Sequence, residues 1–259
     1  MIRGNTTRGL IGSLILGAAL IIGLALPAKA NDNQVSLSAI ATLTTDYVFR
    51  GVSYSGQEPA VQAEFDLAYG IFYAGMWGSN VDLGGTPFGG SVATLEIDYY
   101  AGIAPTWQGI NFDIAGLYYT YPGAYDPAGN FDYFELKTGA SYTFNEALTL
   151  GVANFWSPDY SGGVGDSDAL ELSAEYAFSG KLFNFFSPSV SGGIGWQWFS
   201  DLDSDFTYWN TGLTLGFMEH WSADIRYWDT DFSNTGCAAF TGFRSTCDAR
   251  VVGTISASF

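Results

Sequence analysis

The chain has 259 residues, of which 26 are acidic and 9 are basic, so its formal net charge is −17 at pH 7. Such a surface repels nucleic acid, and no cluster of Lys and Arg is present to bind it. Phe, Trp and Tyr make up 17% of the residues, which excludes a disordered chain because disorder requires few aromatic residues.

The N-terminus has the pattern of a secretory signal peptide. Arg3 and Arg8 precede an uncharged apolar run from Leu10 to Leu26, and Ala28-Lys29-Ala30 offers small residues for cleavage. The run approaches the length of a membrane-spanning helix, but the Ala-x-Ala ending favours removal. We therefore expect a signal peptide over residues 1–30 and a single domain over 31–259. Removal leaves 6 basic and 26 acidic residues, a formal charge of −20.

The mature chain contains twelve segments in which apolar and polar residues alternate. In one of them Leu95, Ile97 and Tyr99 alternate with Glu96 and Asp98. This period of two is typical of a strand with one apolar and one wet face, and the lengths cluster near the ~9–11 residues of a tilted transmembrane strand. The twelve segments are 35–50, 60–69, 71–81, 93–103, 110–121, 133–144, 148–156, 169–178, 187–199, 206–217, 221–228 and 249–259.

Short and long connections alternate between these segments. Short ones lie at 69–70, 106–109, 145–146, 179–186 and 218–220, and longer polar ones at 51–59, 82–91, 122–132, 158–168, 200–205 and 229–248. Short periplasmic turns, longer outer loops and an even strand number are typical of outer-membrane β-barrels. The sequence therefore predicts an all-β, antiparallel transmembrane barrel of about twelve strands, exported to the bacterial outer membrane.

Aromatic residues collect at both ends of the expected strands, as in the two interfacial belts of a lipid-facing barrel. The belt at the short turns comprises Tyr69, Phe144, Tyr176, Phe178, Phe217, Trp221 and Phe259, and the belt at the long loops comprises Tyr47, Phe49, Trp156, Trp198 and Trp209. Phe259 ends the chain on a strand whose Arg250, Thr254, Ser256 and Ser258 share one face. A terminal aromatic of this kind is usual in outer-membrane barrels.

Cys237 and Cys247 are the only cysteines, and both lie in the last long connection. An even pair in an exported protein predicts a disulfide, whereas a metal site would need more ligands than this segment supplies. We expect Cys237–Cys247 to staple an outer loop, and we expect no resident metal or cofactor.

The segment 42–81, TLTTDYVFRGVSYSGQEPAVQAEFDLAYGIFYAGMWGSNV, resembles the TorF family of porin-like proteins, also described as the Gcw-chp family of exported bacterial proteins. The matching blocks are Thr44 to Ser53, Pro59 to Gln62 and Tyr73 to Asn80, and weaker similarity extends across most of the mature chain. The resemblance implies an outer-membrane barrel that conducts solutes, and it brings no agreed substrate.

The parity of the strands places charged side chains in the lumen. We predict that selectivity is set by carboxyl groups opposed by a strip of three arginines from the first and the last two strands, which are neighbours in a closed barrel. The acidic residues are Glu64, Asp66, Glu96, Asp98, Glu135, Glu171 and Glu175, and the arginines are Arg50, Arg226 and Arg250. The acidic excess would concentrate cations.

The predicted function is thus a porin-like channel for passive diffusion of small hydrophilic solutes, with a lumen that favours cations. Two further interpretations stay open: the charges neutralise one another in a filled lumen, or the barrel is a structural or adhesive one whose outer loops bind a partner. The partners expected are outer-membrane lipids and small solutes or ions, and an oligomer is compatible with the sequence.

Enzymatic and metal-dependent functions have little support. The only histidine, His220, lies in a short turn without a serine-centred elbow, which disfavours a hydrolase. Asp201, Asp203 and Asp205 are spaced as in calcium loops, but Phe206 and Gly212 stand where an EF-hand has Gly and Glu. A solvated acidic loop is the default interpretation, with a loose calcium site as the alternative.

Overall fold

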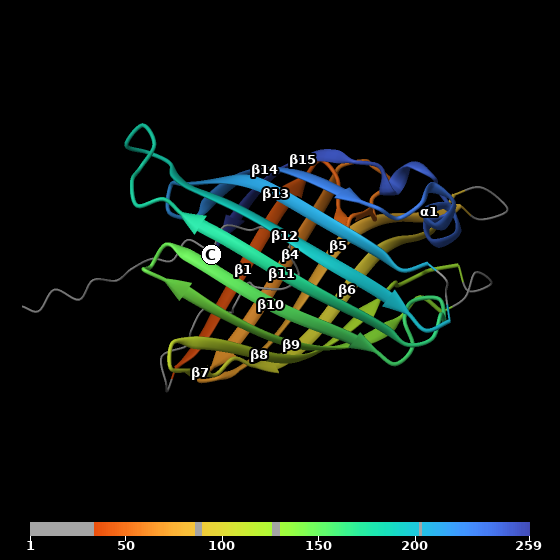
Figure 1. Ribbon diagram of the computed structural model, residues 1–259, viewed down its shortest axis with the longest axis horizontal. Helices are drawn as coiled ribbons and strands as arrows, with labels where there is room; N and C mark the ends of the chain where they lie inside the picture. Colours follow the sequence, from red (N-terminus) through yellow and green to blue (C-terminus); the bar gives the residue numbers. More distant parts are fainter. Residues whose placement is uncertain (1–33, 86–89, 126–129, 202–203) are drawn as a thin grey trace, which may run out of the picture.

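The computed structural model describes residues 34–85, 90–125, 130–201 and 204–259, apart from the side chains of residues 239 and 240. The expected signal peptide over residues 1–30 lies outside the described residues. The described chain forms a closed antiparallel barrel with short turns at one end and longer connections at the other (Figure 1). We call these the turn end and the loop end.

Twelve strands form the barrel wall, as the alternation predicted. In chain order they are β1 (Val35–Thr44), β4 (Ala60–Tyr69), β5 (Phe72–Gly85), β6 (Ser91–Ile103), β8 (Ile110–Thr120), β9 (Tyr133–Phe144), β10 (Leu148–Ser157), β11 (Ser167–Ala177), β12 (Ser187–Phe199), β13 (Phe206–Phe217), β14 (Trp221–Thr230) and β15 (Arg250–Ser258). A two-residue strand, β7 (Thr106–Trp107), pairs with β8 in the turn between β6 and β8.

The ring closes because the first wall strand pairs with the last. β1 pairs with β15 over Ile40↔Ser258 to Thr44↔Thr254, and every other neighbouring pair is antiparallel and consecutive along the chain. Closure leaves no sheet edge, so every strand can satisfy its backbone groups within the hydrocarbon region of a bilayer. The chain end Phe259 stays in register, since its amide donates to the carbonyl of Ala39 at 2.9 Å.

Apolar and charged side chains of the wall strands lie on opposite faces, as the alternation along the sequence predicts. Leu172 and Leu95 point outward and expose 43% and 39% of their surface, whereas Glu96 points inward and exposes 1%. The outer surface carries most of the large apolar side chains, and the lumen carries the charged ones. This is the reverse of a soluble barrel, whose interior is apolar.

The first predicted segment, 35–50, is too long. β1 ends at Thr44, and the chain then turns into the barrel as a small hairpin of β2 (Val48–Phe49) and β3 (Val52–Ser53). Tyr47 and Phe49, which we assigned to the aromatic belt at the loop end, are instead buried in the lumen. The prediction failed there because alternation continues past the point where the backbone leaves the wall.

The last long connection contains elements that the sequence pattern did not reveal. It folds as α1 (Asn234–Thr241) followed by a 3-10 turn at Ser245–Cys247. Ser233 caps α1 by accepting a hydrogen bond from the amide of Gly236, and Gly242 ends it in the left-handed conformation. The predicted Cys237–Cys247 disulfide is present. Within the described ranges, no helix is long and apolar enough to span a bilayer.

Candidate functional site: the lumen and its inward hairpin

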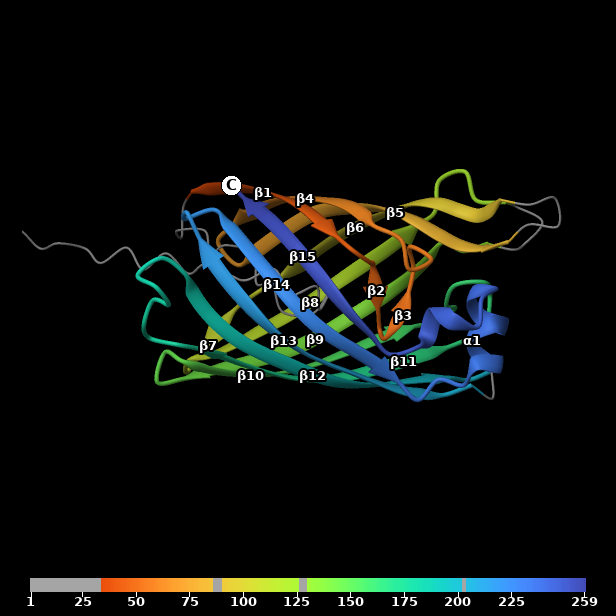
Figure 2. The ribbon, with the colours of Figure 1, turned by 90° about the horizontal axis from the view of Figure 1, so that it is seen from above.

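The hairpin β2–β3 lies inside the barrel near the loop end, as Figure 2 shows. Its tip is Arg50-Gly51, and both residues have positive φ, 48° and 79°. Such a two-residue turn matches the twist of the strands that it joins. Gly51 also fits a tight space, because a Cβ atom there would lie 2.8 Å from the Cβ of Tyr208 on β13. The Gly51 backbone at the hairpin tip therefore packs directly against β13 and β14.

Asp46 fixes the base of the hairpin. Its carboxylate accepts hydrogen bonds from Ser53 at 2.6 Å and Ser55 at 2.9 Å, and it forms an ion pair with Arg250 of β15 at 2.7 Å. The carbonyl of Asp46 also accepts a hydrogen bond from the hydroxyl of Thr44 at 2.8 Å. These contacts tie both arms of the hairpin to the seam where the barrel closes.

Arg50 fixes the hairpin tip. Its guanidinium donates to both carboxylate oxygens of Glu135 on β9, at 2.8 and 3.0 Å, and to the side-chain carbonyl of Gln197 on β12 at 2.9 Å. Glu171 of β11 lies 3.9 Å away. The guanidinium also lies 4.9 Å from the ring centre of Phe155. Arg50 and Glu135 are 5% and 0% exposed, so this ion pair crosses the lumen away from bulk water.

Aromatic side chains fill the space between the hairpin and the wall. Tyr47 of the hairpin packs against Trp77 of β5 at 5.1 Å between ring centres, and Phe49 packs against Tyr119 of β8 at 6.1 Å. Tyr119 stacks on Tyr133 at 4.3 Å. The loop-end half of the lumen is consequently packed like a protein core.

Towards the turn end the lumen becomes accessible. Glu64 and Asp66 of β4 are partly exposed, and the hydroxyl of Tyr100 donates to both, at 3.0 and 2.6 Å. Glu175 of β11 is exposed near the turns. The structure therefore brings Glu64 and Asp66 together, whereas Glu175 lies apart from them on another wall.

Glu96 and Asp98 of β6 are buried deeper, beside the hairpin. One carboxylate oxygen of Glu96 accepts a hydrogen bond from Tyr121 at 2.9 Å. The other oxygen, and one oxygen of Asp98, have no hydrogen-bond partner among the described residues. Both side chains lie on the lumen face, as predicted.

The three arginines lie in the lumen, but they do not form one strip. Arg50 belongs to the hairpin and points away from the seam towards Glu135, and Arg250 pairs with Asp46. Arg226 of β14 pairs with Asp224 at 3.1 Å and donates to Asn210. Each arginine thus has a carboxylate of its own, because a buried cation requires an opposite charge within hydrogen-bonding distance.

Several residues important for this arrangement were not identified from sequence. Asp46, Gln197 and Tyr100 organise the hairpin and the acidic wall through hydrogen bonds to residues that are distant in sequence. Of these features only the hairpin could have been recognised from sequence, because Gly51 interrupts an alternating run there. Of the acidic loop at 200–205, Asp203 lies outside the described residues, Asp201 accepts a hydrogen bond from Ser200, and Asp205 caps the amide of Phe199.

The closed twelve-stranded wall, its apolar exterior and its charged lumen define the molecule as a barrel with the porin fold. It is similar to the solved "KdgM porin", with a TM-score of 0.54 at 6% identity over 86% of this chain and 99% of that chain. A second structure, "KdgM porin in complex with disordered oligogalacturonate", gives 0.52 at 6% identity over 86% and 98%. At such identities the likeness concerns the fold alone.

The chain belongs to the family described as "Bacterial protein of unknown function (Gcw_chp)", whose model matches residues 28–259. No curated protein matches the sequence.

Proposed function

We propose that the protein is an outer-membrane channel for passive diffusion of small hydrophilic solutes, and that its acidic lumen favours cations. In this proposal residues 1–30 are removed on export and 31–259 form a single domain. The turn end faces the periplasm and the loop end faces the outside. The resemblance of the segment 42–81 to the TorF family of porin-like proteins fits this proposal.

The charge balance of the lumen is the observation that carries the cation preference. The four basic side chains that the described lumen contains are each paired: Arg50 with Glu135, Lys137 with Asp113, Arg226 with Asp224, and Arg250 with Asp46. The carboxyl groups of Glu64, Asp66, Glu96 and Asp98 form no ion pair with any residue that the structure describes, and they lie on the nearby strands β4 and β6. A passing cation therefore meets uncompensated oxygens, whereas an anion meets no unpaired base.

This charge balance differs from what an anionic sugar would require. One of the similar structures holds KdgM porin in complex with oligogalacturonate, which is a polyanion. A polyanion would need free guanidinium or ammonium groups along its path. In the present chain these groups are already engaged, so we propose that acidic oligosaccharides are not its substrates.

The hairpin and its aromatic surroundings limit the size of the solute. They fill the loop-end half of the lumen, while the turn-end half carries exposed polar side chains such as Glu175. We infer that the hairpin is the constriction of the channel and that only small solutes pass it.

Ion-selectivity measurements on the purified barrel in planar bilayers test this proposal. We expect a cation-selective reversal potential, and we expect the double variant Glu64→Gln/Asp66→Asn to shift it towards zero. The matched control is Glu146→Gln/Glu219→Gln, which removes two exposed carboxyl groups at the turns, outside the lumen. Anion selectivity of the natural chain would contradict the acidic-lumen proposal.

A second candidate function is a non-conducting structural or adhesive barrel, and the packed loop-end half of the lumen favours it. The last loop also offers an ordered outer surface, because it folds as α1 with a disulfide and its Ser245 carbonyl accepts a hydrogen bond from Gln57, in the segment between β3 and β4. Absence of any current from correctly folded protein would support this candidate. Deletion of residues 231–248 distinguishes the two candidate functions. An adhesin would lose its partner, whereas a channel would keep or increase its conductance.

A further inference from the structure

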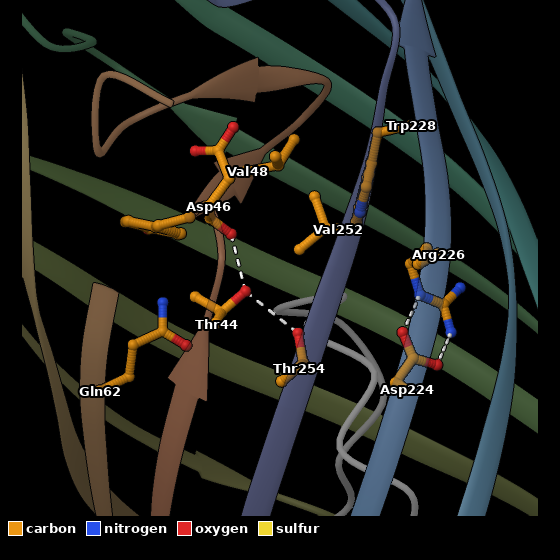
Figure 3. Close-up of a pocket in the computed structure, with 10 residues that line it drawn as sticks. Thr44, Asp46, Val48, Gln62, Asp224, Arg226, Trp228, Val252 and Thr254 are labelled. Atoms are coloured by element: carbon orange, nitrogen blue, oxygen red, sulfur yellow. Dashed lines mark hydrogen bonds and ion pairs between the residues drawn. The ribbon is translucent and has the colours of Figure 1, made fainter. Parts of the chain in front are cut away.

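A small cavity lies on the turn-end side of the hairpin, against the wall formed by β1, β15 and β14 (Figure 3). Its volume is about 30 Å³, room for one water molecule. Thr44, Thr254, Asp224 and Gln62 contribute polar groups to its lining. Gln62 is 2% exposed, and neither atom of its amide has a partner in the described part of the chain. A buried amide of this kind is costly unless a polar molecule reaches it, so the cavity suits a small polar occupant.

On the turn-end side of the cavity, β1 and β15 carry a row of small hydroxyl side chains. Thr44 bonds Thr254 at 3.0 Å, and one step further towards the turns Thr42 bonds Ser256 at 2.9 Å. These side chains are short, and their hydroxyl groups can accept and donate hydrogen bonds to a passing solute. A solute that leaves the cavity towards the turns would pass along these hydroxyl groups.

On its loop-end side the cavity is closed by three apolar side chains. Val48 of the hairpin meets Trp228 of β14 and Val252 of β15, and each of the three is 5% or 6% exposed. They form a cluster of their own, separate from the large aromatic cluster on the other flank of the hairpin. Of the three, only Val48 belongs to the hairpin.

The hairpin has two flanks: the seam flank faces β14 and β15, and the far flank faces the large aromatic cluster. A solute that passed the hairpin would break different contacts on each flank. On the far flank a solute must part the aromatic packing around Tyr47 and Phe49 and the ion pair of Arg50 with Glu135. On the seam flank the ion pair of Asp46 with Arg250 holds the base of the hairpin, and a solute must displace Val48 from two side chains. An apolar constriction of a few side chains can gate a pore by wetting and drying, without rearrangement of the wall.

We propose that solutes pass the hairpin on the seam flank, with Val48, Trp228 and Val252 as a hydrophobic gate and Gln62 as the polar group that receives the solute behind it. This inference rests on the proposed channel function and specifies the route of the solute past the hairpin.

Cysteine accessibility tests the route without requiring a measurable current. The described cysteines are both in the disulfide, so an introduced thiol is the reactive one. Thr254→Cys places a thiol behind the gate, and Ser157→Cys places one on the lumen face of β10, in the opposite wall, where the native serine is 0% exposed. A small cationic thiol reagent is added to proteoliposomes whose loop ends face the bulk solution. We expect Trp228→Ala to raise the labelling rate of Thr254→Cys roughly tenfold or more and to leave that of Ser157→Cys unchanged.

Tyr227→Ala is the matched control, because Tyr227 is the next residue on β14 and points outward. Val252→Ala is the second gate variant, for use if Trp228→Ala fails to fold. Unchanged labelling of Thr254→Cys in folded gate variants would overturn the proposed route, as would faster labelling of Ser157→Cys. The labelling result stands whether or not current is detected, so its failure is distinguishable from failure of the channel proposal.

Discussion

At the scale of single residues, buried ion pairs hold the inward hairpin in place. Arg50 and Glu135 come from segments 85 residues apart and meet in a space without bulk water. A buried ion pair contributes little net stability relative to an apolar pair of the same shape, but loss of one partner is costly because the other charge is left unpaired. The pair therefore specifies where the hairpin docks more than how stable the barrel is.

Replacing Arg50 with Met should weaken the docking of the hairpin by about 3 to 5 kcal/mol, because Glu135 is left buried without its cation. Hydrogen exchange of the Tyr54 amide, which donates to the carbonyl of Tyr47 within the hairpin, measures this docking. The double variant Arg50→Met/Glu135→Met should regain most of the protection. If the double variant exchanges as fast as the single one, the ion pair is not the group that holds the tip.

At the scale of elements, the wall strands were predictable and the inward hairpin was not. In β11 or β12 the alternation of apolar and polar residues directly indicates which side chains face lipid and which face water, since each residue faces one or the other. In residues 45–54 the same alternation persists although the chain has left the wall, because the hairpin also has one polar and one apolar side. The assignment of the arginines to one strip failed for this reason: the strip required Arg50 to end a wall strand.

The disulfide of the last loop should stabilise that loop without affecting the wall. Cys237 and Cys247 are 10 residues apart, a loop whose closure contributes about 2 to 3 kcal/mol in the chain-entropy model. The double variant Cys237→Ser/Cys247→Ser should be cleaved faster by trypsin at Arg244, while the thermal unfolding midpoint of the barrel stays unchanged. A lower midpoint would show instead that the loop supports the pairing of β14 with β15.

At the scale of the whole molecule, the sequence predicted which side chains face the lumen and which face outward. This was possible because side chains alternate between the two faces in every wall strand. Every predicted carboxyl group of the selectivity set lies on the lumen side, from Glu64 on β4 to Glu175 on β11. What the sequence could not supply is which charges compensate each other, since Arg50, Glu135 and Gln197 are brought together only by closure of the ring. The excess of unpaired acid on β4 and β6 is therefore a property of the closed barrel.

Arginine substitutions on the two faces of β11 test this orientation of the whole wall. Leu172 is the central residue of β11 and faces outward, and Ser173 faces the lumen between Gly151 and Gly193 of the neighbouring strands. Leu172→Arg should lower the free energy of unfolding in lipid vesicles by about 2 to 4 kcal/mol, the cost of a guanidinium group near the bilayer midplane.

Ser173→Arg should be nearly neutral for stability, because the lumen is wet there and both neighbours are glycines. It should also reduce the cation preference that we propose for the channel, since its charge lies between Glu171 and Glu175. Urea titration followed by tryptophan fluorescence gives the stabilities, and reversal potentials give the selectivity. The opposite order of stabilities would place Leu172 in an enclosed interior and Ser173 against the lipid, which is incompatible with a transmembrane channel.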